Sequence, residues 1–205
     1  MARGGIYDHV GGGFHRYAVD VEWQIPHFEK MLYDNAQLVR LYLDGWRLTK
    51  EDCFREVVEE TLEYVRREMT HPDGAFFAAQ DSESEGREGA YFVWTPDEIE
   101  AVLGRDLGGE FCRRYGVTPE GNFEGKNVLH RLGGGEPAEE GGPEESVVKA
   151  ARRKLLAVRD KRMKPQRDEN ILTCLLCGAG RALAYAARAH AVADREGRRA
   201  VDDFL

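Results

Sequence analysis

Apolar residues recur at steps of three and four positions along two consecutive stretches of the chain, which is the spacing of an amphipathic α-helix. The first stretch runs from Glu29 to Leu48, and the second runs from Glu51 to Met69. Because only the short link "TK" separates them, they predict an antiparallel helical hairpin. The first apolar face consists of Leu32, Ala36, Val39, Leu43 and Trp46, and the second consists of Phe54, Val57, Val58, Thr61, Leu62, Val65 and Met69.

The pattern changes over residues 75–95, where short aromatic stretches replace the helical period. "AFFAAQD" and "GAYFVWT" are rich in residues that favour strands, and they flank the acidic turn "SESEGRE". These stretches predict a small β-hairpin between helices. A helix is predicted directly afterwards, because Thr95 can cap its first turn, Pro96 suits the first helical position, and Glu98 stands at the capping-box distance.

The rest of the chain is mostly helical in pattern. A short helix near Glu110–Tyr115 precedes a long loop that is rich in glycine and acidic residues and too polar for a core. Further helices are predicted at about residues 144–162, 171–193 and 195–205. The predicted fold class is therefore mainly α, with helices in pairs and one small β excursion.

The composition is that of a globular protein, since 42% of the 205 residues are hydrophobic and 32% are charged. A formal net charge of -8 argues against nucleic acid and against an anionic membrane surface, because both need a basic face. The start of the chain lacks the apolar segment of a secretory signal. The best transmembrane candidate, residues 171–193, contains Arg181, Arg188 and His190 and is too polar to span a bilayer. We therefore expect a soluble, cytoplasmic protein.

A cluster of polar and aromatic residues precedes the first helix, in the stretch "GGGFHRYAVDVEWQIPHFEKMLYD". Each member has a structural interpretation, in which the aromatic rings are core residues, the histidines are hydrogen-bonded, and Lys30 and Asp34 form a surface ion pair. As a group, however, polar and aromatic side chains on a loop beside a rigid helix are typical of a site for a polar ligand. We therefore predict a ligand site in this stretch.

Four stretches of the chain, in order, resemble the helical part of the YyaL family, which is also called the spermatogenesis-associated thioredoxin-domain family. They extend over about residues 4–173 and read "GGIYDHVGGGFHRYAVDVEWQIPHFEKMLYDNAQL", "FFAAQDSESEGREGAYFVWTPDEI", "GVTPEGNFEGKNVLH" and "RDKRMKPQRDENILT". The chain departs from the family pattern at Glu83, where an aspartate is usual. It departs again at residues 174–177, where "CLLC" replaces serine-tryptophan-asparagine-glycine.

The resemblance implies a thioredoxin-like domain followed by an (α/α)6 toroid, similar to N-acylglucosamine 2-epimerases and other six-hairpin carbohydrate enzymes. We expect residues 1–205 to be part of one such toroid, without the thioredoxin-like domain and with too few residues for six hairpins. Its expected parts are a loop and first helical hairpin at 4–70, a β-hairpin at 75–95, short helices and a long loop at 96–142, and further helices at 143–205. Flanking domains or a homodimer would cover the helix faces that this leaves unpaired.

Two further motifs suggest metal binding, but both are weak. His9, His15 and His27 could bind a metal with Asp8 or Glu29, yet their spacing matches no familiar ligand pattern. The acidic "DSESEG" could bind calcium, but it lacks the spacing of an EF-hand and is typical of a solvated turn. We therefore predict neither a metal nor a cofactor.

The residues favour carbohydrate binding or carbohydrate chemistry of the epimerase or glycosidase type. His27 is the predicted proton carrier, because a histidine both donates and accepts protons near neutral pH, and His15 or Glu29 would be its partner. Glycoside cleavage would instead need two carboxylates, for which Asp20 and Glu29 are the candidates. The residues predicted to bind the sugar-like ligand are Arg16, Tyr17, Trp23, Asn35, Asp81 and Trp94.

Two other functions remain open. A non-catalytic scaffold or binding domain of a thioredoxin-domain-containing protein is favoured by the loss of the serine-tryptophan-asparagine segment. A redox function through Cys174 and Cys177 is less favoured, because their CxxC spacing lies in an apolar helical stretch rather than between a strand and a helix. Buried structural cysteines explain this pair better.

Overall fold

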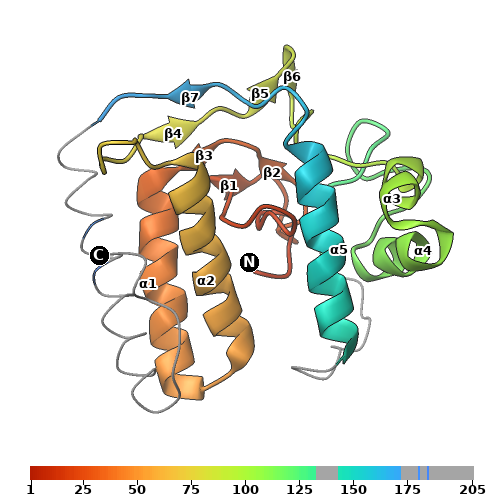
Figure 1. Ribbon diagram of the computed structural model, residues 1–205, viewed down its shortest axis with the longest axis horizontal. Coiled ribbons are helices and arrows are strands. Elements are labelled where there is room, and N and C mark those ends of the chain that lie inside the picture. Colours follow the sequence, from red (N-terminus) through yellow and green to blue (C-terminus); the bar gives the residue numbers. More distant parts are fainter. Residues whose placement is uncertain (133–142, 172–179, 181–183, 185–205) are drawn as a thin grey trace. The chain divides into compact units, whose positions relative to one another are not determined.

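The computed structural model describes residues 1–132, 143–171, 180 and 184 (Figure 1). The predicted helices at 171–193 and 195–205 lie outside these residues almost entirely, and so do Cys174 and Cys177.

The chain is mainly α, as predicted, with short strands between the helices. The helices are α1 (Leu32–Thr49), α2 (Asp52–Glu68), α3 (Pro96–Leu103), α4 (Arg105–Arg114) and α5 (Pro143–Arg159). The strands are two residues long: β1 (Tyr17–Ala18), β2 (Pro26–His27), β3 (Lys30–Met31), β4 (Ala79–Gln80), β5 (Glu83–Ser84), β6 (Arg87–Glu88) and β7 (Arg167–Asp168). They form the antiparallel pairs β1-β2 and β5-β6 and a sheet of order β3-β4-β7.

The chain divides into two compact units. The first unit contains residues 1–30 and 80–167, and the second contains residues 31–79 and the residues from 168 onward. The chain passes from one unit to the other within β3, β4 and β7.

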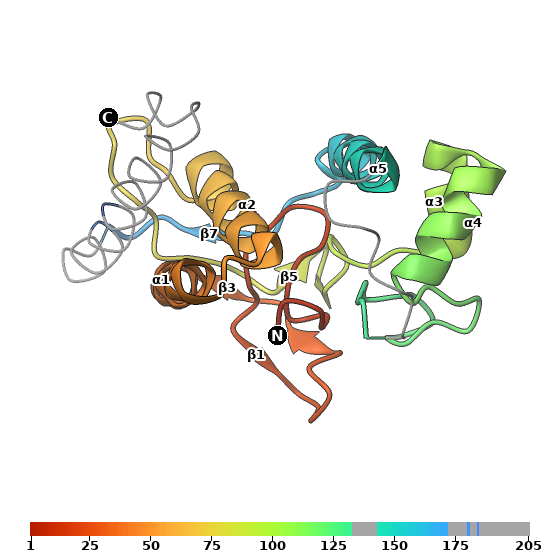
Figure 2. The ribbon, with the colours of Figure 1, turned by 90° about the horizontal axis from the view of Figure 1, so that it is seen from below.

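The predicted helical hairpin is confirmed in the second unit, where α1 and α2 lie side by side (Figures 1 and 2). Leu32, Ala36, Tyr64 and Val65 form one buried cluster between them, and Val39, Leu43 and Val58 form another. The helix α1 begins at Leu32 rather than at Glu29, because Lys30 and Met31 are taken up by β3. The periodicity of the sequence therefore found the helix, but the strand pairing set its first residue.

The helices α3, α4 and α5 share one hydrophobic cluster of the first unit, in which α3 and α4 lie side by side (Figures 1 and 2). The predicted capping box opens α3: Thr95 Oγ1 accepts a hydrogen bond from Glu98 N at 3.2 Å, and Glu98 Oε2 accepts one from Thr95 N at 2.8 Å. The helix α4 begins at Arg105, five residues before the predicted start, because Gly104 with φ of 83° ends α3 and begins α4 without a linker. The core of these helices contains Val10, Trp94, Ile99, Phe111, Cys112, Tyr115, Val117, Leu129, Ala151 and Leu155.

A β-hairpin forms within residues 75–95, but its strands are not the predicted aromatic stretches. They are β5 and β6, which pair Glu83 with Glu88 and Ser84 with Arg87. The turn residues Glu85 and Gly86 have φ of 56° and 70°, the left-handed conformation of a two-residue hairpin turn. The first aromatic stretch contributes β4 to the sheet with β3 and β7, so it does not pair with the second. In the second, Tyr91, Phe92 and Val93 are buried in a hydrophobic cluster around Phe28 instead of forming a strand of the hairpin.

In the part of the chain that the structure describes, no helix combines the length and the apolar character needed to cross a bilayer.

Candidate functional site

The strands β1 and β2 bring together several of the predicted site residues. Tyr17 is paired with His27, and their rings are stacked with centroids 5.0 Å apart and planes 19° apart. His27 and Glu29 lie in extended backbone rather than in a helix, so side chains two positions apart face the same side. His27 Nε2 accordingly lies 4.0 Å from Glu29 Oε2.

A carboxylate from a distant part of the chain completes this group. His27 Nδ1 lies 2.7 Å from Glu88 Oε1, and the backbone N–H of Phe28 lies 3.4 Å from the same oxygen. Glu88 is not among the predicted site residues, because it ends the acidic stretch "SESEGRE", whose composition is typical of a solvated turn. The available signal was "EG" at 85–86, which predicts a tight hairpin turn with Glu88 on its returning strand.

Arg16 joins the group through Glu29. Its Nη1 atom donates to Glu29 Oε2 at 2.6 Å, and its backbone N–H donates to the Glu29 carbonyl at 2.8 Å. The side chain of Arg16 is 44% exposed and that of Glu29 is 24% exposed, so the ion pair is at the surface. We call Arg16, Tyr17, His27, Glu29 and Glu88 the His27 cluster.

The His27 cluster has the geometry of a proton-transfer site. When His27 Nδ1–H donates to Glu88, the carboxylate fixes the tautomer, and Nε2 is left with a lone pair that can accept a proton. The His27 side chain is 28% exposed, so a ligand can reach the ring. Glu29 lies near Nε2 but is oriented by Arg16.

Asp20, a predicted catalytic carboxylate, instead organises the loop between β1 and β2. Its carboxylate accepts hydrogen bonds from the backbone N–H groups of Glu22, Gln24 and Ile25 at 2.9, 3.0 and 2.5 Å. Desolvation opposes ionisation, but the bonds from Gln24, Ile25 and Glu22 prevail and lower the pKa of Asp20. Asp20 therefore stays ionised and holds a loop conformation.

His15, the predicted partner of His27, is buried and 3% exposed. Its Nδ1 atom lies 2.8 Å from the Phe28 carbonyl, and its ring is edge-on to Phe28 and Phe92. Burial lowers the pKa of His15 to about 3, so the ring is neutral at physiological pH. With Asp8 and His9 it lines a cavity of about 10 Å³, which is room for about one water molecule.

The remaining predicted sugar-binding residues have different surroundings. Trp23 is 42% exposed on the loop between β1 and β2. Trp94 is fully buried in the core of the first unit, with the Arg162 guanidinium 4.1 Å from its ring centroid, so no ring face is open to a ligand. Asn35 is buried in the second unit, where its Nδ2 atom donates to the Met31 carbonyl at 2.9 Å. Asp81 accepts hydrogen bonds from Ser82 N at 2.6 Å and Glu83 N at 3.2 Å, which stabilises a turn.

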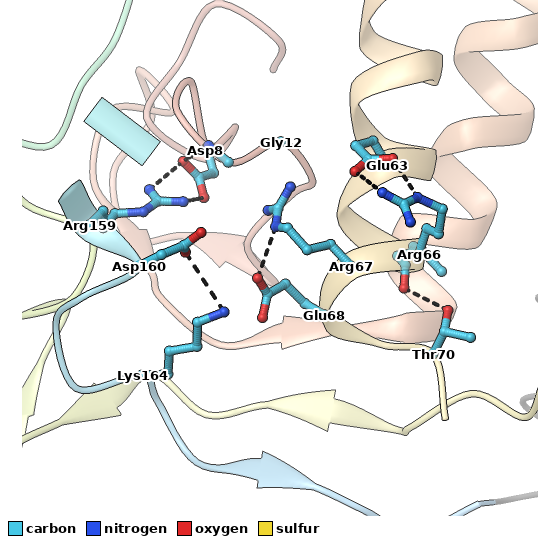
Figure 3. Close-up of polar contacts among 12 residues, drawn as sticks. Asp8, Gly12, Glu63, Arg66, Arg67, Glu68, Thr70, Arg159, Asp160 and Lys164 are labelled. Atoms are coloured by element: carbon cyan, nitrogen blue, oxygen red, sulfur yellow. Dashed lines mark hydrogen bonds and ion pairs between the residues drawn. The ribbon is translucent and has the colours of Figure 1, made fainter. Parts of the chain in front are cut away.

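A buried ion cluster in the first unit was not predicted. Asp8 accepts hydrogen bonds from Arg159 Nη1 and Nη2, both at 2.8 Å (Figure 3), and from Lys30 Nζ at 2.8 Å. The interpretation of Lys30 as part of a surface ion pair with Asp34 is wrong, since the Lys30 side chain is 1% exposed. Burial opposes ionisation of Asp8, but the two cations, Arg159 foremost, hold its pKa well below the ordinary value. The same pairing raises the pKa of Arg159 against its own desolvation.

The hypothesis of a metal site in this region gains no support from the geometry. Among the residues described by the structure, no group of three or more histidine, cysteine, aspartate or glutamate side chains is arranged to hold a metal ion.

Comparison with known proteins identifies relatives. Spermatogenesis-associated protein 20 of Homo sapiens is 39% identical over 154 residues, and this match covers 63% of the chain. The protein of the same name from Mus musculus is 38% identical over the same share, and an uncharacterized protein of Caenorhabditis elegans is 39% identical over 64% of the chain. The chain is homologous to spermatogenesis-associated protein 20. These relatives carry the name of the family that the sequence resembles, as predicted.

The match concerns one region of these relatives. The chain spans about a fifth of their length, 20% of the human protein and 21% of the Caenorhabditis elegans protein. No protein-family model matches the chain.

Proposed function

We propose that this chain is part of a carbohydrate-binding or carbohydrate-active (α/α)6 toroid in which His27 exchanges a proton with a sugar ligand. The observation that carries the proposal is the 2.7 Å contact between His27 Nδ1 and Glu88 Oε1 at a partly exposed position among polar and aromatic residues. A carboxylate that orients an accessible imidazole is the arrangement by which proteins prepare a histidine for acid–base chemistry.

The surroundings of His27 suit a ligand with hydroxyl groups. Arg16 supplies N–H donors, Glu29 and Glu88 supply acceptors, and the half-exposed ring of Tyr17 supplies a flat apolar face. A site that recognises a small ligand commonly combines such an apolar surface with a few convergent polar groups.

Proton transfer at a carbon beside a carbonyl fits this geometry better than glycoside cleavage. Cleavage requires one free carboxylic acid and one free carboxylate that flank the bond. Here the Glu88 carboxylate is hydrogen-bonded to His27 and the Glu29 carboxylate is hydrogen-bonded to Arg16, so neither carboxylate is free. The Nε2 atom of His27, in contrast, can accept a proton and return it. We therefore place the proposed activity in the isomerase or epimerase class, with His27 as the base and Glu88 as its positioning residue.

The test is ligand-induced thermal stabilisation with monosaccharides, their 2-acetamido forms and the corresponding ketoses. Wild-type protein is compared with His27→Gln and Glu88→Gln, and with His71→Gln as a control on a histidine of the second unit. A stabilising sugar is expected to lose its effect in His27→Gln and to keep it in the control.

Chemistry is then tested by the incorporation of solvent deuterium at the carbon beside the sugar carbonyl, followed by NMR. Exchange that requires His27 and slows in Glu88→Gln supports the proposal. A sugar that binds equally well to wild type and His27→Gln would contradict the assignment of the site.

The alternative, a non-catalytic binding or scaffold domain, is supported by a separate observation. His15, Asp20 and Trp94, three of the predicted site residues, are committed to internal hydrogen bonds or to the core. A folded sample that no sugar stabilises would favour this function over the enzymatic one.

A further inference from the structure

Four large apolar side chains are exposed in alternation along β1 and the loop that follows it. Tyr17 is 49% exposed, Val19 64%, Val21 88% and Trp23 42%. Single exposed apolar side chains are common on proteins, but a row of four within seven residues is a local apolar patch of the kind that marks a binding surface. We call these four residues the apolar row.

The loop that carries the apolar row is held in one conformation. The Asp20 carboxylate accepts hydrogen bonds from three backbone N–H groups of the loop, and Val19 N donates to the Ile25 carbonyl at 2.9 Å. A loop that is already ordered loses little conformational entropy when a ligand binds. The exposed side chains are therefore presented by a preorganised support.

Trp23 adopts an unfavourable backbone conformation at this place. Its φ is 63°, in the left-handed region that bulky residues rarely occupy. Close packing maintains it, because a Cβ on Gly4 would lie 2.2 Å from the Trp23 carbonyl oxygen, and the same oxygen accepts a hydrogen bond from Ile6 N at 3.3 Å. Backbone strain that is maintained while the indole stays 42% exposed suggests a function for the ring.

We infer that the apolar row is a second subsite beside the His27 cluster, and that the ligand is an oligosaccharide of at least two rings. The inference rests on the proposed function. Tyr17 belongs to both surfaces, because it stacks on His27 and begins the apolar row. One sugar ring would lie at the His27 cluster, with its neighbour against the indole of Trp23.

The exposed carboxylate within the apolar row favours a sugar over an apolar protein partner. Glu22 lies between Val21 and Trp23 and is exposed. A sugar ring presents C–H groups on its faces and hydroxyl groups on its rim, so it can use an aromatic face and a nearby carboxylate together. A purely apolar partner would leave the Glu22 charge without water or a hydrogen-bond donor.

The test compares the affinities of one-, two- and three-unit sugars of the glucose and N-acetylglucosamine series, measured by calorimetry on the whole chain. The variants are Trp23→Gly, which removes the indole and accepts a φ of 63°, and Trp23→Phe, which keeps an aromatic face. Leu48→Gln is the control, since it changes an 86% exposed apolar side chain of α1 that belongs to neither the His27 cluster nor the apolar row.

In wild type, a disaccharide is expected to bind roughly tenfold more tightly than its monosaccharide, because a stacking contact of ordinary strength corresponds to about that factor. Trp23→Gly is expected to abolish this difference without changing monosaccharide affinity, while Trp23→Phe and Leu48→Gln preserve most of it. Equal affinities for one- and two-unit sugars would overturn the inference and leave the proposed function intact.

Two further outcomes also overturn it. If no sugar of any length binds, the proposed function fails and the inference fails with it. If Trp23→Gly instead changes the oligomeric state by light scattering, with no effect of chain length, the apolar row contacts a protein surface.

Discussion

Arg159, the last residue of α5, donates two parallel hydrogen bonds to the carboxylate of Asp8, which precedes it by 151 residues (Figure 3). Both side chains are almost completely buried, at 3% and 5% exposure. The ion pair therefore connects the C-terminal end of α5 to the N-terminal segment of the first unit. Gly11 allows this approach, because a Cβ at that position would lie 2.0 Å from an Arg159 nitrogen.

The first prediction concerns this ion pair. Arg159→Met is expected to lower the free energy of unfolding by about 3–5 kcal/mol, because Asp8 would keep a buried charge with only Lys30 to balance it. Denaturant unfolding measures the change. Arg153→Met, an exposed arginine of the same helix, is the matched control and is expected to change stability by less than about 0.5 kcal/mol. Equal effects of the two variants would contradict the role of the pair.

The second prediction is a loss of stability in mild acid. Burial lowers the pKa of both His9 and His15 to about 3, whereas a histidine in the unfolded chain has a pKa of 6.5. Between these values the unfolded state binds protons that the folded state does not. The stabilisation is thus complete above pH 6.5 and is lost as the pH falls from 6.5 toward 3.

Each histidine contributes up to about 1.4 kcal/mol per pH unit within this window. His15→Gln keeps a donor for the Phe28 carbonyl but does not titrate, so the slope of unfolding free energy against pH is expected to fall by about that amount. Unfolding curves at a series of pH values test this. An unchanged slope would show that His15 is not buried in its neutral form.

The third prediction compares two glycines with nearly the same φ. Gly89 has φ of 69°, and a Cβ there would lie 2.5 Å from a ring carbon of Phe28, whereas Gly86 has φ of 70° and nothing within 4 Å. Gly86→Ala is expected to cost about 1–2 kcal/mol from the left-handed conformation alone. Gly89→Ala is expected to cost roughly a further 1–3 kcal/mol, because the fully buried Phe28 must shift. Equal losses would mean that Phe28 can move freely.

The fourth prediction concerns the start of α3. Thr95→Ala removes the hydroxyl that accepts from Glu98 N, so it is expected to lower stability by about 1 kcal/mol. Thr95→Ser keeps this hydroxyl and is the control, with a loss of only a few tenths of that amount expected. Thermal unfolding of the two variants beside wild type is the measurement, and equal melting temperatures for Ala and Ser would contradict the cap.

Part of the candidate site followed from the sequence, because its members are close together along the chain. Arg16, Tyr17, His27 and Glu29 belong to one loop and strand pair, and the structure brings them into contact. The hydrogen-bond acceptor of His27 was missed, since Glu88 is 61 residues away and reaches it only when β5 and β6 fold as a hairpin. The turn at 85–86 indicates the hairpin, but spacing along the chain does not indicate that Glu88 contacts His27.

Local signals in the sequence are sufficient to locate several elements of the fold. Periodicity locates the apolar faces of α1 and α2, and cap chemistry locates the capping box of α3. Each of these signals depends on residues within one or two helical turns. Which polar residues are buried, and which partner each one has, depends instead on contacts between distant parts of the folded chain. Lys30 could have lain on the surface beside Asp34, but it lies in the interior against Asp8, because a buried charge requires an opposite charge and the fold supplies one 22 residues away.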